Sequence, residues 1–264
     1  MSAMTDVAMR TLRGERVRGV ARRMANMLPE DARRRIKNTT TRVETAMGHP
    51  PLLVPPGELE AVYREALDGL VARGGPEAVG DYLEFGVFVG TSLACMARAL
   101  DAAGLDAPRL IGFDSFEGLP EAARADDEGA WLRPGRWASG IDNTRRNLVR
   151  QGVDMSRVTL VKGWFDDTCT PELARRLNIR RAGVVMLDCD LSSSTTTALD
   201  FVEPFLRGEA VLVFDDWGDL AHRDLGQKRS LDEFLDRHPR FETEAVGDYG
   251  DTGHVVRLIE RSPD

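Results

Sequence analysis

Short apolar segments alternate with amphipathic segments from residue 58 to the end of the chain. Five mostly apolar runs predict buried strands: Tyr82–Phe85, Arg109–Phe113, Val158–Val161, Gly183–Leu187 and Ala210–Phe214. Segments of helical period predict helices near 58–72, up to residue 100, up to residue 151, at 195–206 and at 228–236. Two last strands, Phe241–Val246 and His254–Ile259, are close enough to pair as an antiparallel hairpin. The alternation predicts an α/β domain with a doubly wound, mostly parallel seven-stranded sheet.

The first 57 residues have a different pattern. Two or three short helices are expected in residues 1–50, with arginines opposite one apolar stripe, which consists of Val17, Val20, Ala21, Met24 and Met27. The proline-rich stretch 48–57 is expected to form a rigid connector. The sequence therefore predicts a helical N-terminal arm and connector over 1–57 and an α/β domain over 58–264. The arm and the long insertion 115–140 are both candidates to close over a bound substrate.

Charge is distributed unevenly along the chain. Residues 1–45 carry eleven Lys and Arg against five Asp and Glu, a net of +6, which leaves −14 on the remainder of a chain of net charge −8. A basic arm suits nucleic acid or a membrane surface, or else docking on the acidic body or on a second subunit. Docking is favoured because residues 1–45 contain no aromatic residue to stack on bases.

Other compositional features exclude several classes of protein. No apolar run has the roughly 20 residues of a membrane span, and arginines interrupt the N-terminus where a secretory signal has an apolar core. Cys95, Cys169 and Cys189 are widely spaced, so they form neither a zinc motif nor a disulfide framework. We expect a cytoplasmic protein without nucleic-acid or membrane partners.

The first strand leads into a glycine-containing turn. Glu84 and Phe85 are followed by Gly86 and, four residues later, by Gly90, Thr91 and Ser92. Glycines at these positions allow close backbone approach, and the N-terminus of the next helix suits an anion. The turn differs from the glycine pattern of nicotinamide enzymes, because Phe88 replaces its second glycine. A cofactor cradle is favoured over an ordinary strand-to-helix turn.

The next two strands also end in residues suited to a nucleoside. Asp114 follows the second strand, where a carboxylate accepts ribose hydroxyls, although a turn-capping aspartate is the alternative. The third strand leads into Gly163, Trp164 and Phe165, where an aromatic ring lies against an adenine or packs in the core.

Four carboxylates follow the fourth and fifth strands. Asp188 and Asp190 come after one strand, and Asp215 and Asp216 after the other. Like charges on adjacent strand ends repel unless they take up protons or bind a cation. Oxygen ligands suit Mg²⁺, Mn²⁺ or Ca²⁺. A metal site is favoured over separate solvated turn residues.

Taken together, these stretches resemble the macrocin O-methyltransferase family, which methylates sugar hydroxyls on antibiotics. The matching segments are Asp81–Ser92, Ile111–Pro120, Lys162–Thr168, Leu187–Thr195, Val213–Trp217 and, more weakly, Gly226–Phe234. The resemblance implies a class I, Rossmann-like methyltransferase that uses S-adenosylmethionine (SAM) and a magnesium-like metal, and commonly a homodimer. It implies metal ligands at Asp188, Asp215 and Asp216, and a general base at Asp188 or, failing that, Asp190. The implied cofactor-binding residues are Glu84, Gly86, Gly90, Thr91, Ser92, Asp114, Ser115, Gly163, Trp164, Phe165 and Asp188.

The resemblance also implies an acceptor, a hydroxyl of a glycosylated small molecule. This chain departs from the family near that acceptor, since it has Cys189, Ser192 and Ser193 where Gly, Tyr and Glu are usual, and Phe88-Val89 where Trp-Arg is usual. A non-sugar vicinal diol or catechol-type molecule is therefore the alternative acceptor. The rival functions are a nucleotide-sugar or NAD enzyme on a similar sheet, and a non-catalytic SAM-fold binding protein.

Overall fold

The computed structural model describes residues 55–121, 134–217 and 226–261. The chain divides into two compact units, Met1–Leu53 and Val54–Asp264. The predicted helical arm and most of its connector lie outside the described residues, as does the middle of the insertion 115–140. Pro56 and Gly57, predicted to belong to the connector, form the start of the first described helix, because proline is well tolerated in the first turn of a helix.

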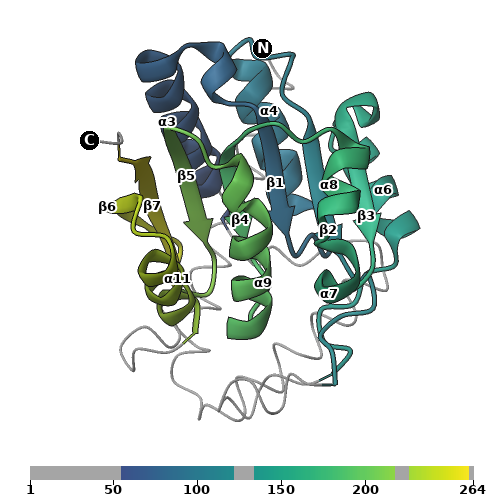
Figure 1. The fold of residues 1–264 in the computed structure, drawn as a ribbon. Coiled ribbons are helices and arrows are strands. Elements are labelled where there is room, and N and C mark those ends of the chain that lie inside the picture. Colours follow the sequence, from purple (N-terminus) through teal and green to yellow (C-terminus); the bar gives the residue numbers. More distant parts are fainter. Residues whose placement is uncertain (1–54, 122–133, 218–225, 262–264) are drawn as a thin grey trace, which may run out of the picture. The chain divides into compact units, whose positions relative to one another are not determined.

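A seven-stranded sheet forms the centre of the second unit, in the order β3-β2-β1-β4-β5-β7-β6 (Figure 1). Its strands are β1 (Asp81–Phe85), β2 (Leu110–Asp114), β3 (Val158–Lys162), β4 (Ala182–Leu187), β5 (Glu209–Phe214), β6 (Phe241–Tyr249) and β7 (Gly253–Glu260). The first five strands are parallel, and β7 is antiparallel to both β5 and β6. The predicted α/β fold, with its C-terminal antiparallel hairpin, is confirmed.

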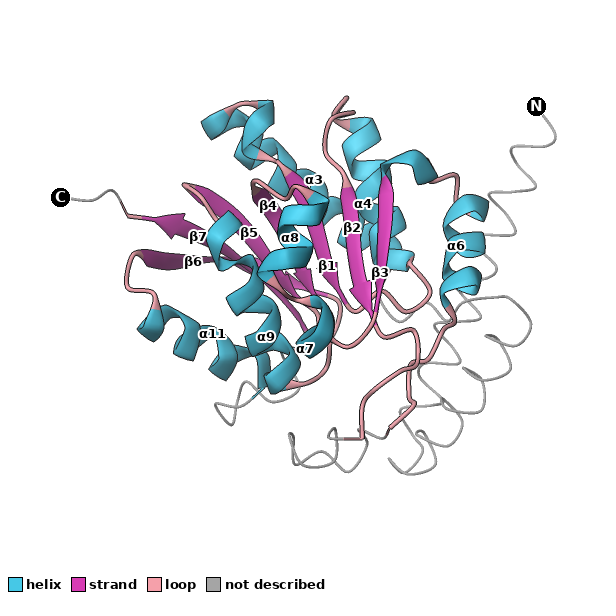
Figure 2. Ribbon diagram, turned by 45° about the vertical axis from the view of Figure 1, so that its right-hand side comes forward, coloured by secondary structure: helices cyan, strands magenta, loops and turns pink. Residues whose placement is uncertain are grey.

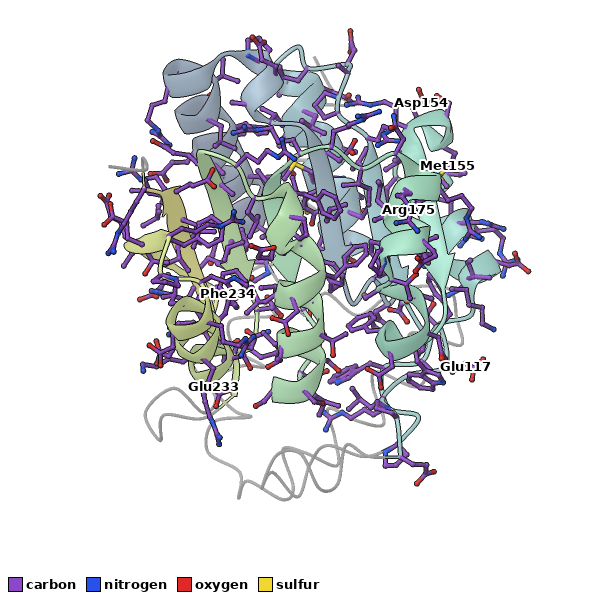
Figure 3. The ribbon with its side chains drawn as sticks, viewed as in Figure 1. Glu117, Asp154, Met155, Arg175, Glu233 and Phe234 are labelled. Atoms are coloured by element: carbon purple, nitrogen blue, oxygen red, sulfur yellow. The ribbon has the colours of Figure 1, made fainter. Side chains whose placement is uncertain are left out.

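Helices cover both faces of the sheet (Figure 2). One face carries α3 (Pro56–Gly74), α4 (Thr91–Ala102) and α6 (Ile141–Arg150), and the other carries α7 (Phe165–Thr168), α8 (Pro171–Leu177), α9 (Ser192–Val202) and α11 (Gly226–Arg237). Each layer has its own apolar core against the sheet. On α11, Phe234 is fully buried in the second core, whereas its neighbour Glu233 points to solvent (Figure 3).

Four elements differ from the sequence-based expectation. Helices α7 and α8 were not predicted, although Thr170 caps the Leu173 amide, Pro171 begins α8 and Asn178 ends it in a left-handed conformation. Helix α9 begins at Ser192 rather than 195. It ends at Val202, and a 3-10 turn over Glu203–Phe205 replaces the last turn of the predicted helix 195–206, because Pro204 cannot continue an α-helix. Strand β6 extends three residues beyond Val246, past a bulge.

The order of the strands determines where a ligand can bind. Chain order reverses between β1, which leads to β2 on one side, and β4, which leads to β5 on the other. In open α/β sheets, ligands bind outside the carboxyl ends of the strands at this switch point. The predicted site residues lie at this edge, either in the last residues of β1 and β2 or in the segments that follow β1 to β5.

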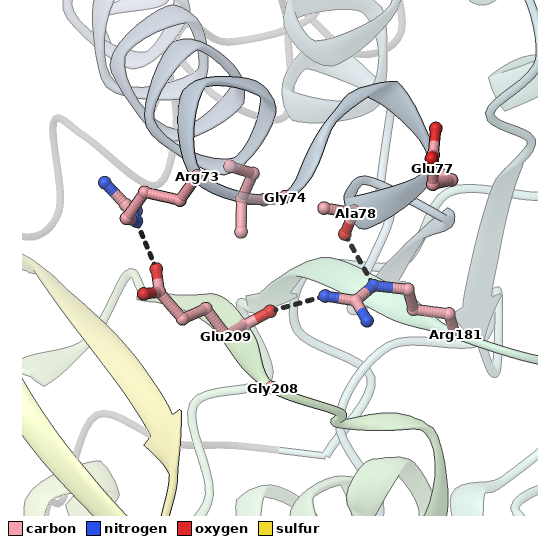
Figure 4. Close-up of a pocket in the computed structure, with 8 residues that line it drawn as sticks. Arg73, Gly74, Glu77, Ala78, Arg181, Gly208 and Glu209 are labelled. Carbon is pink, nitrogen blue, oxygen red and sulfur yellow. Dashed lines mark hydrogen bonds and ion pairs between the residues drawn. The ribbon is translucent and has the colours of Figure 1, made fainter.

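A cavity of about 330 Å³ lies at the opposite edge, where β4 and β5 begin (Figure 4). Arg181 crosses it and donates to the carbonyl oxygens of Ala78 and Glu209, at 2.7 and 3.1 Å, while Arg73 pairs with the Glu209 carboxylate. These bonds join strand starts to the end of α3 and the following turn. Among the described residues, no helix has the length and apolarity needed to cross a membrane.

The first prediction concerns Gly183, the extra residue where the β1–β4 register shifts. A Cβ there would lie 2.4 Å from the carbonyl oxygen of Val79. Gly183→Ala should destabilise the domain by about 1–3 kcal/mol, as overpacking does, and lower the melting temperature by several degrees in thermal denaturation. Gly247→Ala in β6 is the matched control, because a Cβ there meets nothing within 4 Å. Equal melting temperatures for the two variants would contradict the packing argument.

Candidate active site

The turn after β1 packs directly against the end of β4. Gly86 has φ of 90°, and a Cβ on it would lie only 1.6 Å from the carbonyl oxygen of Asp188. Only glycine fits this contact without moving the backbone. Gly86 was expected to let a ligand approach the backbone closely. The structure shows that it brings two strand ends into contact, which joins the predicted cofactor turn to the predicted metal ligands.

Asp114 holds the same turn from the end of β2. Its Oδ2 accepts the amides of Val87 and Phe88, both at 2.8 Å, and its Oδ1 accepts the amide of Phe116 at 2.5 Å. Burial raises the pKa of Asp114, and the three backbone bonds oppose that rise. A carboxylate has roughly four acceptor positions, so three bonds leave space for about one more donor. Asp114 thus shapes the turn through three backbone hydrogen bonds and has about one acceptor position left.

Strained backbone is concentrated around this turn. Phe88, Phe116 and Asp190 are non-glycine residues with φ of 48°, 56° and 60°. Trp137, with φ of 62°, packs its ring edge-on against Phe88, with the ring centroids 5.9 Å apart. Each such residue costs about 1–3 kcal/mol, and strain of this kind clusters at ligand sites. Surrounding hydrogen bonds, such as that from the Thr144 hydroxyl to the Phe88 carbonyl, hold these residues in their strained conformations.

Glu84 lies beneath the turn and is fully buried. Ser92 Oγ donates to its Oε1 and Tyr82 OH to its Oε2, both at 2.6 Å, and the Tyr82 hydroxyl is 2.8 Å from that of Tyr63. Burial raises the pKa of Glu84 to about 8. Both of its oxygens therefore contact protein groups, and its visible role is to anchor Ser92 and the start of α4 under the turn.

The N-terminus of α4 is the part of the turn best suited to an anion. Gly90, in the left-handed conformation, precedes Thr91 and Ser92, and no side chain caps the helix. Gly90 also fits close to Leu148, whose Cδ2 would be 2.8 Å from an added Cβ. The first amides of a helix bind carboxylates and phosphates well when no side chain caps them.

The residues after β3 divide into packed and accessible side chains. Phe165 packs edge-on against Phe85 at 5.6 Å, whereas Trp164 is 37% exposed. Gly163 has φ of 148°, and a Cβ on it would lie 2.7 Å from the Thr168 side chain. The Ser115 hydroxyl bonds within its own turn: it donates to the Gly118 carbonyl and accepts the Glu117 amide. Trp164 is therefore the accessible ring at this strand end.

Three carboxylates converge at the ends of β4 and β5. Ligand oxygens of Asp188, Asp215 and Asp216 all lie within 4.8 Å of one another. Strand-end hydrogen bonds align them: the Asp188 amide donates to the Phe85 carbonyl at 2.9 Å and the Asp215 amide to the Leu187 carbonyl at 3.1 Å. Burial, followed by the charges of the other two acids, raises the pKa of Asp188 well above its usual value. The repulsion in this cluster is relieved when one of the acids is protonated or when a cation binds between them.

Asp216 is held by residues from two other elements. The Asp190 amide donates to its Oδ2 at 3.0 Å. Gln227 of α11 accepts the Asp216 amide at 3.0 Å and donates to the Leu187 carbonyl at 2.9 Å. Gln227, which is 1% exposed, was not among the predicted site residues. Its stretch resembled the family only weakly, and its role depends on α11 packing across β4 and β5.

Asp215 is held by two residues of the β6–β7 hairpin. The Tyr249 hydroxyl donates to Asp215 Oδ1 at 2.8 Å, and the Thr252 hydroxyl to the Asp215 carbonyl at 2.6 Å. Burial, and then the charge of Asp215, raise the pKa of Tyr249 well above its usual value, so its hydroxyl keeps the proton that it donates. Neither residue was predicted to belong to the site, because the predicted strand ended at Val246.

Sequence comparisons place the chain among known proteins. A family model described as Macrocin-O-methyltransferase (TylF) matches residues 62–238. A curated relative is 8-demethyl-8-(2,3-dimethoxy-alpha-L-rhamnosyl)-tetracenomycin-C 4'-O-methyltransferase of Streptomyces olivaceus, 36% identical over 150 residues. The aligned part is 55% of this chain and 56% of that relative, so the chain matches about half of the relative's length.

Solved structures share the fold. The O-methyltransferase NovP superposes with a TM-score of 0.62 at 22% identity and covers 77% of this chain and 79% of its own. An O-methyltransferase from Bacillus cereus, in complex with SAH, superposes with a TM-score of 0.55 at 16% identity and covers 92% of this chain and 97% of its own. Both are similar to this chain in the architecture of the sheet and its helical layers.

The second prediction uses the buried Glu84. The folded chain holds the Glu84 proton up to about pH 8, whereas the unfolded chain loses it near 4.5, so between these values the unfolded state binds fewer protons. The free energy of unfolding should therefore fall as pH rises, by up to about 1.4 kcal/mol per pH unit from this group. Glu84→Gln mimics the protonated acid and should gain stability relative to the wild type between pH 5 and 8.

Thermal denaturation in a chelating buffer at pH 5, 6.5 and 8 measures this gain. Glu77→Gln, at an exposed position, controls for the loss of one negative charge. Parallel pH profiles for the wild type and Glu84→Gln would contradict the assignment of a buried proton to Glu84.

Proposed function

Because the chain belongs to the macrocin O-methyltransferase family, we propose that it is a SAM-dependent O-methyltransferase that acts on a sugar hydroxyl of a glycosylated small molecule. One observation supports this most directly. The three carboxylates at the ends of β4 and β5 adjoin the turn after β1, where Asp188 and Gly86 are in contact. Metal-assisted methyl transfer requires the metal site and the cofactor turn to be adjacent, because the acceptor on the metal must lie close to the methyl donor on the turn.

The residues present fit a divalent cation. Asp188, Asp215 and Asp216 offer only oxygen ligands, and burial together with the charges of the other two acids raises the pKa of Asp188. Oxygen-only sets suit Mg²⁺, Mn²⁺ or Ca²⁺. When bound, the cation would neutralise this repulsion, hold two neighbouring oxygens of the acceptor and lower the pKa of the hydroxyl.

The residues after β1, β2 and β3 fit SAM, which supplies the methyl group when bound. The uncapped N-terminus of α4 at Thr91 and Ser92 suits the methionine carboxylate. Asp114 has about one acceptor position left for a ribose hydroxyl, and the exposed Trp164 suits one face of the adenine. Glu84 supports the start of α4 indirectly, by accepting the hydrogen bond of the Ser92 hydroxyl.

Asp188 is best placed to take the proton of the acceptor hydroxyl. It is the acid that contacts the cofactor turn, through Gly86, and it also belongs to the carboxylate cluster. Asp190 is the alternative base, although its backbone amide already contacts Asp216 and its φ of 60° fixes its direction. Positioning by these rigid strand ends supplies much of the rate enhancement.

The acceptor is inferred from the relative's activity, since the Streptomyces olivaceus enzyme is a 4'-O-methyltransferase of a rhamnosyl tetracenomycin. Short serine side chains, Ser192 and Ser193, begin α9 next to the acids. They replace the larger Tyr and Glu expected for the family, so a catechol-type acceptor is the alternative. Assays that pair rhamnosylated natural products with their aglycones, and include a catechol, separate the two. Homodimerisation belongs to the same proposal.

The third prediction concerns the metal. Chelation with EDTA should abolish methyl transfer and added Mg²⁺ should restore it. Asp215→Asn should lower kcat at least about 100-fold, because substitutions outside the ligand shell already cost roughly 10- to 100-fold. Methyl transfer from labelled SAM measures both effects, with Asp142→Asn on the exposed start of α6 as the control. Full activity after exhaustive chelation would rule out the metal-dependent proposal.

The fourth prediction concerns Asp114. Asn at this position loses one acceptor oxygen and presents an amide group to the backbone amides of Val87 and Phe88. Hydrogen bonds to a charged group contribute about 1.5–3 kcal/mol, so Asp114→Asn should weaken binding of S-adenosylhomocysteine at least about tenfold in calorimetric titration. Asp142→Asn should bind it as the wild type does. If the wild type binds NAD and not S-adenosylhomocysteine, the cofactor assignment is wrong.

A further inference from the structure

Strand β6 contains a bulge that lies outside the residues proposed to bind the cofactor, the metal or the acceptor. Ala245 pairs with Val256 and Gly247 pairs with Val255, so Val246 is an extra residue without a partner in β7. Val246 is 46% exposed. A bulge of one residue shifts the alternation of side chains, so residues on either side of it exchange faces.

The bulge determines which face Tyr249 occupies. Phe241 and Tyr249 are eight residues apart and would share a face in a regular strand. Instead, Phe241 lies in the core beneath α9 and α11, whereas Tyr249 lies in the core beneath α3 and α4. Val213 of β5 faces the same core as Tyr249, and Asp215 continues that face two residues later. The bulge thus brings Tyr249 to the side of the sheet where Asp215 lies.

Two further contacts hold the Tyr249 ring there. Tyr249 pairs across the hairpin with Gly253, and a Cβ on Gly253 would lie 2.3 Å from the tyrosine ring. Only a glycine lets the ring lie flat over the opposite strand. The ring is 6% exposed, and its hydroxyl ends 2.8 Å from Asp215 Oδ1. The ring is thus confined on one side by backbone and directed at one carboxylate oxygen.

We propose that Tyr249 is a positioning residue, directed by the bulge at Val246 and by Gly253, that fixes the Asp215 carboxylate in the orientation needed to bind the divalent cation. The inference rests on the proposed function, because it assigns a role at the same metal site. Hydrogen bonds to ligating carboxylates fix their orientation and so reduce the freedom that is lost on metal binding. Tyr249 itself does not touch substrate or cofactor in this role.

The test is a Mn²⁺ titration of the full-length protein, followed by the electron paramagnetic resonance signal of the free ion. Tyr249→Phe keeps the ring and removes the hydroxyl, and it should raise the Kd for Mn²⁺ by roughly 10- to 100-fold. Tyr63→Phe is the matched control, since it also removes a buried hydroxyl, one that contacts Tyr82 and none of the three acids. Its Kd should remain within about twofold of the wild type.

Two more measurements separate positioning from general damage. Gly253→Ala, which displaces the ring, should weaken Mn²⁺ binding in the same direction, while S-adenosylhomocysteine affinity should stay unchanged in Tyr249→Phe. Equal Mn²⁺ affinities for wild type and Tyr249→Phe, or equal losses in Tyr249→Phe and Tyr63→Phe, would overturn the inference and leave the metal site standing. Failure of the wild type to bind Mn²⁺ would overturn the proposed metal site and the inference together.

Discussion

The repulsion among Asp188, Asp215 and Asp216 is the interaction around which this edge of the sheet is organised. Three carboxylates within 4.8 Å are unfavourable without a proton or a cation. Separate elements nonetheless hold the last two of them in place. Gln227 of α11 accepts the backbone amide of Asp216, and Tyr249 at the end of β6 donates to the Asp215 carboxylate. These contacts keep the acids together, and a cation bound between them would meet an ordered site.

The contact between Gly86 and Asp188 joins this cluster to the cofactor turn. A Cβ at Gly86 would fall 1.6 Å from the Asp188 carbonyl oxygen, and the Asp188 amide donates to the Phe85 carbonyl, so the turn after β1 and the end of β4 are packed backbone against backbone. Asp114 adds three hydrogen bonds to the turn from the other side. The strained φ angles of Phe88 and Asp190 flank this joint. A methyl donor on the turn and an acceptor on the metal would therefore be held at a fixed separation.

Much of this arrangement could be predicted from local pattern. Apolar runs located the five parallel strands, because buried parallel strands are nearly continuous in Val, Leu, Ile and Phe. The two antiparallel strands were predicted as a hairpin near the C-terminal end. Each of the three grouped acids lies within two residues of the end of such a run, so the strand prediction alone placed them at one edge. Short elements were missed instead. Helix α8 has only seven residues, Pro171–Leu177, too few for a periodic signal, and its caps at Thr170 and Asn178 were the evidence available.

By itself, the sequence determined which residue types stand at the strand ends, and hence the fold class, the family and the acids that could share a cation. Only the tertiary structure decided what those residues contact. Gly86 faces Asp188, and Tyr249 reaches Asp215 from 34 residues further along the chain. The physical reason is that side-chain direction depends on register. One unpaired residue, Val246, changes the face of every residue after it in β6, and no periodicity along the chain reveals that until β7 is in place.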